Sequence, residues 1–552
     1  MKKNDFIIIF LSIAISICGV FLENSKFFET TVRTLKNRQL PSSLLNYGKT
    51  GQLFKRMGLP YIAPKEEDTD YPIPKQTILN LTKLDIRKEW IGAENLPPEK
   101  IISTTIMDQS IIKTGMPIIS LYMDYYDLYD KFNGIYTNPL ERGRNWERPC
   151  FISYFKNGKL IFGTHAGARI HGGTSRLHDL KSFRLYFRPT YGKEEFLKGV
   201  LFNGSGDPLK TIIVRKADEI YGFVNSMAYE IARKAGCYAP FTEPAKLYLN
   251  GKPHGHGNFE IIEHITKQYC INHFGHDNFV FYKVKGGEKI PPEYKVLSDW
   301  ARFSKDQITF ESVSQLIDME NFIKTWIVNI ICGNSDPYQG VALLDKTQSN
   351  PKWFWIMWDM DHSFKNIYEH DKKNIWEKER PINLVYSDKK KETDPRYFIF
   401  RKLILHDDHF RKLFKKQMED KYNYVLTTDY LLSVVDKYIA MAKKFGMDVT
   451  KAEKELHEYM IHRPEFSMNM MNRYFNLGDV KKVRFTIPSG VTVTVNGYPI
   501  KKSFTGLYFQ GSEIILSVSK GTTKGWMING TIFNNSNIKI KIQDNINLIA
   551  LQ

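Results

Sequence analysis

The sequence predicts an α+β protein with a strand-rich first half, a mostly helical centre and a C-terminal all-β module. Three observations predict this class. Residues 181–188 alternate apolar and polar side chains, as in a half-buried strand. Residues 322–331 repeat apolar side chains at helical spacing, as in a buried helix. After residue 480, short strand-like segments alternate with Gly- and Asn-rich turns.

A hydrophobic N-terminal segment precedes these elements. Lys2 and Lys3 are followed by an apolar run of 17 residues, at positions 6–22. A signal-peptide core has about 7–15 apolar residues and a spanning helix about 20, so the length lies between the two. No small-x-small cleavage site follows the run. We therefore favour a membrane anchor over a cleaved signal peptide for residues 1–22, and both remain open.

Composition excludes several classes of partner and site. The formal net charge is +18, but Lys and Arg are spread along the chain without a zinc finger, an RNA-binding signature or a basic heptad array. We therefore expect no nucleic-acid partner. The five cysteines form no C-x-x-C pair, which argues against a cysteine zinc cluster.

The first half of the chain carries further predicted elements. Strands are expected at residues 117–122, 151–155 and 159–162, loops at 134–136 and 146–149, a helix at 217–235 that ends at Gly236, and a hairpin of 247–249 with 259–262 around Asn250-Gly251. Lys181 shares a strand face with Phe183 and Leu185, so it is expected to point inward, near a cleft.

A predicted hairpin flanked by aspartates points to a functional site. The helix over 322–331 ends at Gly333, and a loop with Asp336 follows. Strands are expected at 341–344 and 353–358, and Asp359 comes directly after the second. Because adjacent strands lie about 5 Å apart, an antiparallel hairpin brings Asp336 and Asp359 to the same open end.

Clustered carboxylates point to a cation. Asp361 adds a third acidic side chain to Asp336 and Asp359. Like charges are costly to bury together, and Mg²⁺ or Ca²⁺ relieves this cost. Helix, loop Asp, hairpin and second Asp is also the order of the catalytic half of a protein kinase. The alternative is that Asp359 and Asp361 cap a turn while Asp336 is solvated.

Several motifs resemble one family. Trp-Asp-Met-Asp-His-Ser-Phe at residues 358–364 resembles the strongest signature of the CotH kinase family, named for spore coat protein H. Other blocks agree in order, at residues 134–136, 146–148, 167–175, 181–184, 250–251 and 257–263. The resemblance covers about residues 115–475.

The resemblance implies an atypical, distantly protein-kinase-like fold. It also implies ATP and Mg²⁺ or another divalent cation as cofactors, and phosphorylation of Ser or Thr in a protein substrate of unknown identity. By position, Asp336 matches the catalytic aspartate, and Asp359 and Asp361 match the metal-binding and third acidic positions. Basic residues of the family's first half match Arg169 and Lys181, which with Glu263 are expected to bind the nucleotide. The alternative for Lys181 is a strand-end side chain that reaches solvent, and the alternatives for Glu263 are a pair with Lys181 or an ordinary surface acid of the hairpin.

One position departs from the pattern. Kinases place Asn a few residues after the catalytic Asp as a second metal ligand. Here residues 337–341 are Pro, Tyr, Gln, Gly and Val, and Gln339 is left to supply a neutral oxygen. This departure keeps two alternatives open, a catalytically inactive surface or coat scaffold and, more weakly, a metal-dependent hydrolase.

Four regions follow from these observations. They are the anchor or signal peptide (1–22), a membrane-proximal region (23–110), the CotH kinase-like domain (111–476) and the C-terminal β module (477–552). The module holds no expected phosphotransfer residue.

Three aromatic side chains of the C-terminal β module, Tyr498, Tyr508 and Trp526, are expected to pack inside it rather than stack on glycans. With the N-terminal segment, the resemblance implies a membrane-anchored or exported, extracytoplasmic bacterial protein.

Overall fold

A computed structural model describes residues 110–191, 197–198, 201–202, 208–284, 289–304, 307–337, 339–365, 374–386, 394–518 and 525–551. The expected N-terminal anchor at residues 1–22 lies outside the described residues, as does the membrane-proximal region up to residue 109. Among the helices of the described ranges, none is both long and apolar enough to cross a membrane. The chain divides into two compact units, one reaching to Lys216 and including Glu243–Ile262, the other comprising Ala217–Thr242 and the chain from Glu263 onward.

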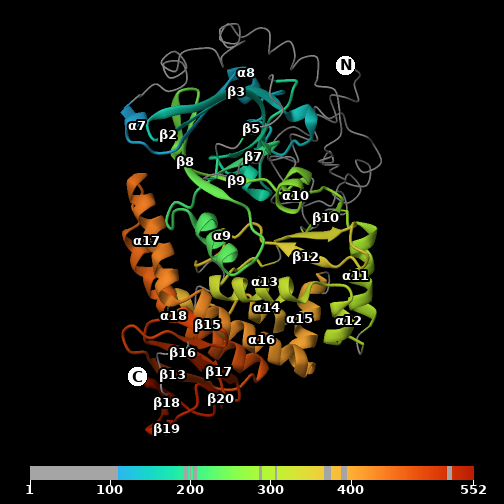
Figure 1. The fold of residues 1–552 in the computed structure, drawn as a ribbon. Coiled ribbons are helices and arrows are strands. Elements are labelled where there is room, and N and C mark those ends of the chain that lie inside the picture. The colour runs from blue at the N-terminus through green and yellow to red at the C-terminus, as the bar shows by residue number, and fades with distance from the viewer. Residues whose placement is uncertain are drawn as a thin grey trace, which may run out of the picture. The chain divides into compact units, whose positions relative to one another are not determined.

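The first unit is built on a closed barrel (Figure 1), with strand order β1-β2-β3-β4-β7-β9-β8. Its strands are β1 (Ile118–Met123), β2 (Arg148–Lys156), β3 (Lys159–His171), β4 (Ser182–Tyr186), β7 (Thr211–Lys216), β8 (Thr242–Leu249) and β9 (Lys252–Glu263). Parallel pairing of β1 with β8 closes the barrel. The predicted strands and the turn at Asn250-Gly251 are confirmed. The hairpin strands are longer than predicted, and residues 259–262 do not pair with 247–249, because β9 begins directly after the turn at Lys252 and the Glu263 amide bonds to the Phe241 carbonyl.

Four predicted boundaries in this part of the sequence are wrong. Arg148 and Pro149 were expected in a loop, but they begin β2, because they pair with Ala168 and Gly167 of a β3 longer than predicted. Lys181 precedes β4 rather than lying in it. The helix expected over 217–235 is α9 (Val224–Lys234), and it begins later than predicted because the chain before it forms a bridge between Asp218 and Gly222. Helix α9 belongs to the second unit.

Helices surround a small sheet in the second unit. The sheet has the order β10-β11-β12, with β10 (Phe279–Lys283), β11 (Val341–Asp345) and β12 (Trp353–Ile356). The longer helices are α10 (Lys267–Phe274), α11 (Pro292–Phe303), α13 (Met319–Cys332), α15 (Pro395–His406), α16 (Asp408–Asp420), α17 (Thr428–Lys444) and α18 (Thr450–Phe475). The mostly helical centre with one hairpin is thus confirmed, whereas β10 was not predicted.

Helix α13 begins and ends as its sequence predicts. The side chain of Asp318 accepts a hydrogen bond from the Asn321 amide at its first turn. Gly333 ends the helix with φ +54°, a left-handed conformation that favours glycine. A Cβ at Gly333 would lie 2.6 Å from the Tyr459 hydroxyl, so this position has no room for a side chain either.

The C-terminal strands form two sheets around their own core. The sheet orders are β16-β13-β21-β18-β19 and β15-β14-β17-β20. The strands are β13 (Val480–Thr486), β14 (Val493–Val495), β15 (Tyr498–Ile500), β16 (Phe504–Phe509), β17 (Glu513–Val518), β18 (Gly525–Ile528), β19 (Thr531–Phe533), β20 (Asn537–Lys541) and β21 (Ile546–Leu551). Trp526 and Tyr508 are fully buried, which confirms that they pack inside the module. Tyr498 is half-buried and stacks on Tyr424, which precedes residue 477, so the prediction that it packs inside the module is wrong. That residues 477–552 fold as a separate module stays a prediction.

A buried carboxylate joins helix α16 to these strands. One oxygen of Glu419, Oε1, accepts hydrogen bonds from the Phe509 amide at 2.8 Å and from the Ser512 hydroxyl at 2.5 Å. Burial raises the pKa of Glu419 to about 7, against the lowering effect of these hydrogen bonds and of Lys415. The folded protein therefore binds a proton here more tightly than the unfolded chain does.

Glu419→Gln is expected to remove a pH dependence of stability. The pKa of Glu419 lies above its ordinary value of 4.5, so its stabilising effect is complete below pH 4.5 and is lost as pH rises through about 7. That loss is on the order of 3 kcal/mol. Gln keeps the accepting oxygen without the charge, so the variant should be the more stable protein at pH 8. Urea unfolding at pH 5 and pH 8 measures this, with the exposed Glu513→Gln as control, and equal pH dependence of Glu419→Gln and wild type would contradict it.

Candidate active site

The loop that carries Asp336 is built on the end of helix α13. The side chain of Asn334 is fully buried, donates to Asn329 Oδ1 at 2.9 Å, and accepts from the Asp336 amide at 3.0 Å. The half-buried Asp336 accepts a hydrogen bond on Oδ2 from Gln339 Nε2 at 3.1 Å. Its other oxygen, Oδ1, has no hydrogen-bond partner among the described residues.

The hairpin brings the Asp336 and Asp359 loops together, as predicted. Val341 pairs with Ile356 and Leu344 with Trp353, so the two loops leave the same end of the β11–β12 hairpin. They are hydrogen-bonded to each other, from the Ser335 amide to the His362 carbonyl at 3.2 Å and from the Phe364 amide to the Cys332 carbonyl at 2.9 Å. The two loops therefore form one joined surface.

The loop that carries Asp359 has an unusual backbone. Asp359 adopts φ +58°, a left-handed conformation that costs an L-residue about 1–2 kcal/mol. Its amide donates to the hydroxyl oxygen of Tyr229 on α9 at 2.9 Å. Strand β12 stops at Ile356 rather than at the predicted residue 358, because the next amide, that of Met357, bonds to the Tyr238 carbonyl. Met360 is buried, whereas Asp359 and Asp361 are half-buried.

One side-chain oxygen near Asp336 has the chemistry of a ligand for a hard cation. The side-chain oxygen of Gln339, Oε1, is buried and has no hydrogen-bond partner within the described part of the chain. A neutral oxygen of this kind suits Mg²⁺, with carboxylates of Asp359 and Asp361 as further ligands. Within the described ranges, no group of three or more His, Cys, Asp or Glu side chains is arranged to hold a metal ion.

Arg463 binds the end of helix α13 from which the Asp336 loop begins. This fully buried side chain of α18 donates from Nε and Nη2 to the Ile330 carbonyl, at 3.0 and 2.6 Å. Through Nη1 it donates to the carbonyls of Trp376 and Lys378, at 2.8 and 2.5 Å. The guanidinium thus satisfies the Ile330 carbonyl at the C-terminal end of α13, where the helix dipole favours a positive charge. It also joins this end to the chain that follows the Asp359 loop.

Sequence reasoning missed the residues that hold the two loops. Arg380 Nη1 donates to the Ser335 carbonyl at 3.0 Å across 45 residues of sequence. Tyr229 reaches Asp359 across 130 residues, and Arg463 reaches Ile330 across 133. No local pattern marks these three side chains, because the fold alone chooses their partners.

Glu263 lies at the end of β9 and at the start of the second unit's longer segment. Its buried carboxylate accepts from the Phe241 amide at 3.2 Å and lies 2.9 Å from His273 Nε2. The imidazole of His273 stacks on Tyr269 with ring centroids 3.9 Å apart. The expected nucleotide contact of Glu263 stays a prediction.

The two basic candidates lie in the first unit and have internal partners. Lys181 Nζ donates to the carbonyls of Arg176 and His178, at 3.0 and 2.8 Å, and burial lowers its pKa. Arg169 donates to Oε2 of the fully buried Glu147, at 3.0 and 2.7 Å. Glu147 also accepts from Arg188 Nε at 3.0 Å, so this cluster holds more positive than negative charge. The roles of both basic residues toward a nucleotide stay predictions.

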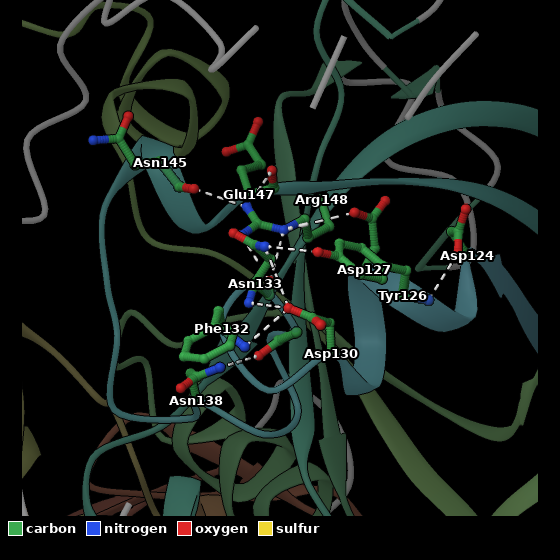
Figure 2. A network of polar contacts seen from close by, with 11 residues as sticks. Asp124, Tyr126, Asp127, Asp130, Phe132, Asn133, Asn138, Asn145, Glu147 and Arg148 are labelled. Atoms are coloured by element: carbon green, nitrogen blue, oxygen red, sulfur yellow. Dashed lines mark hydrogen bonds and ion pairs between the residues drawn. The ribbon is translucent and has the colours of Figure 1, made fainter. Parts of the chain in front are cut away.

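Two of the quoted motifs, at residues 134–136 and 146–148, lie between β1 and the start of β2, and Figure 2 shows the polar contacts of Arg148 in this segment. Arg148 donates to the Asn133 carbonyl from Nε and Nη2, at 3.1 and 2.8 Å, and lies 3.8 Å from Asp127. Asp130 Oδ1 accepts from the amides of Phe132 and Asn133. A Cβ at Gly134 would lie 2.6 Å from backbone atoms of Asp130. Gly134 and Arg148 therefore maintain the shape of this segment.

Comparison with known proteins gives one family, and remote structural alignments that include the two described below. Residues 168–474, more than half of the 552, match the family model described as CotH kinase protein. No curated protein matches the sequence. The structure of hydra Fam20 with sugar aligns at TM-score 0.27 and 9% identity, covering 71% of this chain and 91% of that one. The crystal structure of the golgi casein kinase aligns at TM-score 0.24 and 7% identity, covering 56% and 74%.

Proposed function

Because the chain belongs to the CotH kinase protein family, we propose that it is an atypical kinase that transfers a phosphoryl group from ATP to a Ser or Thr hydroxyl of a protein. One observation carries the proposal beyond the family. The Asp336 and Asp359 loops are hydrogen-bonded to each other at the open end of one hairpin. Family membership agrees with the resemblance read from the sequence motifs.

Asp336 is proposed to act on the substrate hydroxyl. Its Oδ2 accepts from Gln339, whereas Oδ1 has no partner among the described residues and is left to accept the hydroxyl proton. A carboxylate in this role orients the nucleophile and takes its proton as the oxygen attacks the terminal phosphorus of ATP. The bond from that phosphorus to the bridging oxygen of ADP breaks in the same transfer.

Asp359, Asp361 and the Gln339 oxygen are proposed to hold a divalent cation. When bound, Mg²⁺ neutralises charge on the phosphate oxygens of ATP. The positive charge of the ion would then offset the repulsion and the desolvation cost of two negative carboxylates in one half-buried loop. A nucleotide-binding role for Lys181 and Arg169 of the first unit stays a proposal from the resemblance alone.

Radiolabelled ATP tests the proposal directly. The full chain is incubated with ATP labelled at the terminal phosphate, with Mg²⁺ or with a chelator, alone and with added test proteins. Magnesium-dependent label on Ser or Thr is the expected result. Free phosphate release without labelled protein would instead indicate a hydrolase.

An inactive scaffold is the second candidate, and the residues after Asp336 favour it. Residues 337–341 contain no Asn, which removes the usual second metal ligand. A folded wild-type protein that neither binds ATP nor transfers label would establish this alternative. Membrane anchoring through residues 1–22 and an extracytoplasmic location remain proposals from the sequence.

Asp359→Asn is expected to abolish magnesium-dependent ATP binding. The amide removes the charge that attracts the cation, while its size keeps the half-buried loop filled. Calorimetric titration of ATP with and without Mg²⁺ measures the effect. Asp345→Asn is the matched control, because Asp345 lies at the turn end of the same hairpin and its carboxylate binds Thr347 and Gln348. Unchanged magnesium-dependent affinity in Asp359→Asn would remove Asp359 from the metal site.

A further inference from the structure

We infer that Tyr229 of helix α9 is a positioning residue for Asp359, and that its hydroxyl sets the affinity of the site for a divalent cation. The inference rests on the proposed function, because it assigns Asp359 to the cation. Nothing in the sequence motifs or in the family match points to Tyr229. Its own contact with the Asp359 loop carries the argument.

The contact is made at the backbone of Asp359 itself. The amide of Asp359 donates to the Tyr229 hydroxyl oxygen at 2.9 Å, and the tyrosine is buried. Asp359 has φ +58°, a conformation that an L-residue keeps only when its surroundings determine it. A hydrogen bond from this amide to a fixed hydroxyl is such a determinant. It sets the direction in which the Asp359 side chain leaves the loop.

Helix α9 fixes the position of the Tyr229 hydroxyl, because the helix is well packed. Its residues are buried almost throughout, from Val224 to Ala232, so the ring of Tyr229 is held by packing on all sides. The segment around α9 also meets the Asp359 loop at two flanking points. The Met357 amide donates to the Tyr238 carbonyl at 2.9 Å, and Lys365 Nζ lies 2.5 Å from Asp218 Oδ2.

The contacts of Met357 with Tyr238 and of Lys365 with Asp218 hold the two ends of the Asp359 loop. Tyr229 alone among these contacts bonds to the residue that would ligate the cation. Partners of a metal ligand fix its orientation, and their removal typically weakens metal affinity by about 10- to 100-fold. Loss of the hydroxyl should therefore act on cation binding more than on the fold.

Tyr229→Phe tests the inference, because it removes the hydroxyl and keeps the ring. Mn²⁺ serves as the probe, since its paramagnetism reports binding without any turnover. The full chain is titrated with Mn²⁺ in the presence of a non-hydrolysable ATP analogue, and free Mn²⁺ is measured by electron paramagnetic resonance. Tyr229→Phe is expected to bind Mn²⁺ about 10- to 100-fold more weakly than wild type.

Tyr422→Phe is the matched control. Tyr422 is also buried, and its hydroxyl accepts from Ser467 Oγ at 3.0 Å rather than from the Asp359 amide. This variant should bind Mn²⁺ like wild type although it too loses a buried hydrogen bond. Thermal unfolding of both variants identifies any general loss of structure. Asp359→Asn in the same titration gives the signal of an absent site.

The outcomes distinguish the positioning role of Tyr229 from the proposed kinase function. Wild-type affinity in Tyr229→Phe, with lost binding in Asp359→Asn, would overturn the positioning role and leave the proposed function standing. Equal weakening in Tyr229→Phe and Tyr422→Phe would also overturn it, because a general loss of packing would then explain both. A wild-type protein that binds no Mn²⁺ would overturn the proposed function, and the role of Tyr229 with it.

Discussion

Asp336→Asn is expected to lower the rate of phosphotransfer by about 10²- to 10⁴-fold while ATP affinity stays near the wild-type value. The carboxylate is used mainly in the transition state, where the substrate hydroxyl loses its proton. Asn is nearly the same size, and its oxygen still accepts from Gln339 Nε2, so the loop keeps its shape. Label transfer under saturating ATP gives the rate, and calorimetry gives the affinity.

Two results would contradict this role for Asp336. Transfer at the wild-type rate would show that another group accepts the proton. A parallel loss of ATP affinity would show that Asp336 binds the cation–nucleotide complex instead. Asp345→Asn at the other end of the hairpin is the control, and it should leave both quantities unchanged.

Arg463→Met is expected to lower the free energy of unfolding by about 3–5 kcal/mol. The substitution leaves the carbonyls of Trp376 and Lys378 without the charged donor that they have in the fold. Hydrogen bonds to charged groups stabilise by about 1.5–3 kcal/mol each, and water cannot replace the donor at a fully buried position. Urea unfolding followed by tryptophan fluorescence measures the change.

The same helix provides the control for Arg463. Arg473 also lies on α18, but its side chain is 57% exposed and forms a surface ion pair with Glu379 at 3.2 Å. Arg473→Met should therefore change stability by less than about 1 kcal/mol. Similar losses in the two variants would show that the buried contacts of Arg463 contribute no more than an exposed pair does.

Local sequence patterns predicted the elements around the site. The apolar spacing over 322–331 and the glycine that follows it gave helix α13 with its end at Gly333. Two short apolar runs separated by a turn gave the β11–β12 hairpin, and with it the shared end of the Asp336 and Asp359 loops. These predictions succeeded because capping, periodicity and antiparallel pairing depend on residues close together in the chain.

Pairing across long stretches of sequence was not predictable in the same way. Strand β10 (Phe279–Lys283) is short, and its partner β11 begins nearly sixty residues later, at Val341. The closing pair of the barrel, β1 with β8, joins Ile118 to Lys246. A short apolar run does not specify which distant run it will join, so these contacts follow from packing.

By itself, the sequence determined the helices and hairpin around the site, the loop positions of Asp336, Asp359 and Asp361, and the family. Only the tertiary structure decided what holds those loops. It brought the Tyr229 hydroxyl into a hydrogen bond with the Asp359 amide, and the Arg463 guanidinium into hydrogen bonds with the Ile330 carbonyl at the end of α13. It also gave the Lys181 ammonium two carbonyl partners. The physical reason is that backbone patterns act over one or two turns, whereas a buried donor or acceptor must find its partner wherever the packed chain presents one.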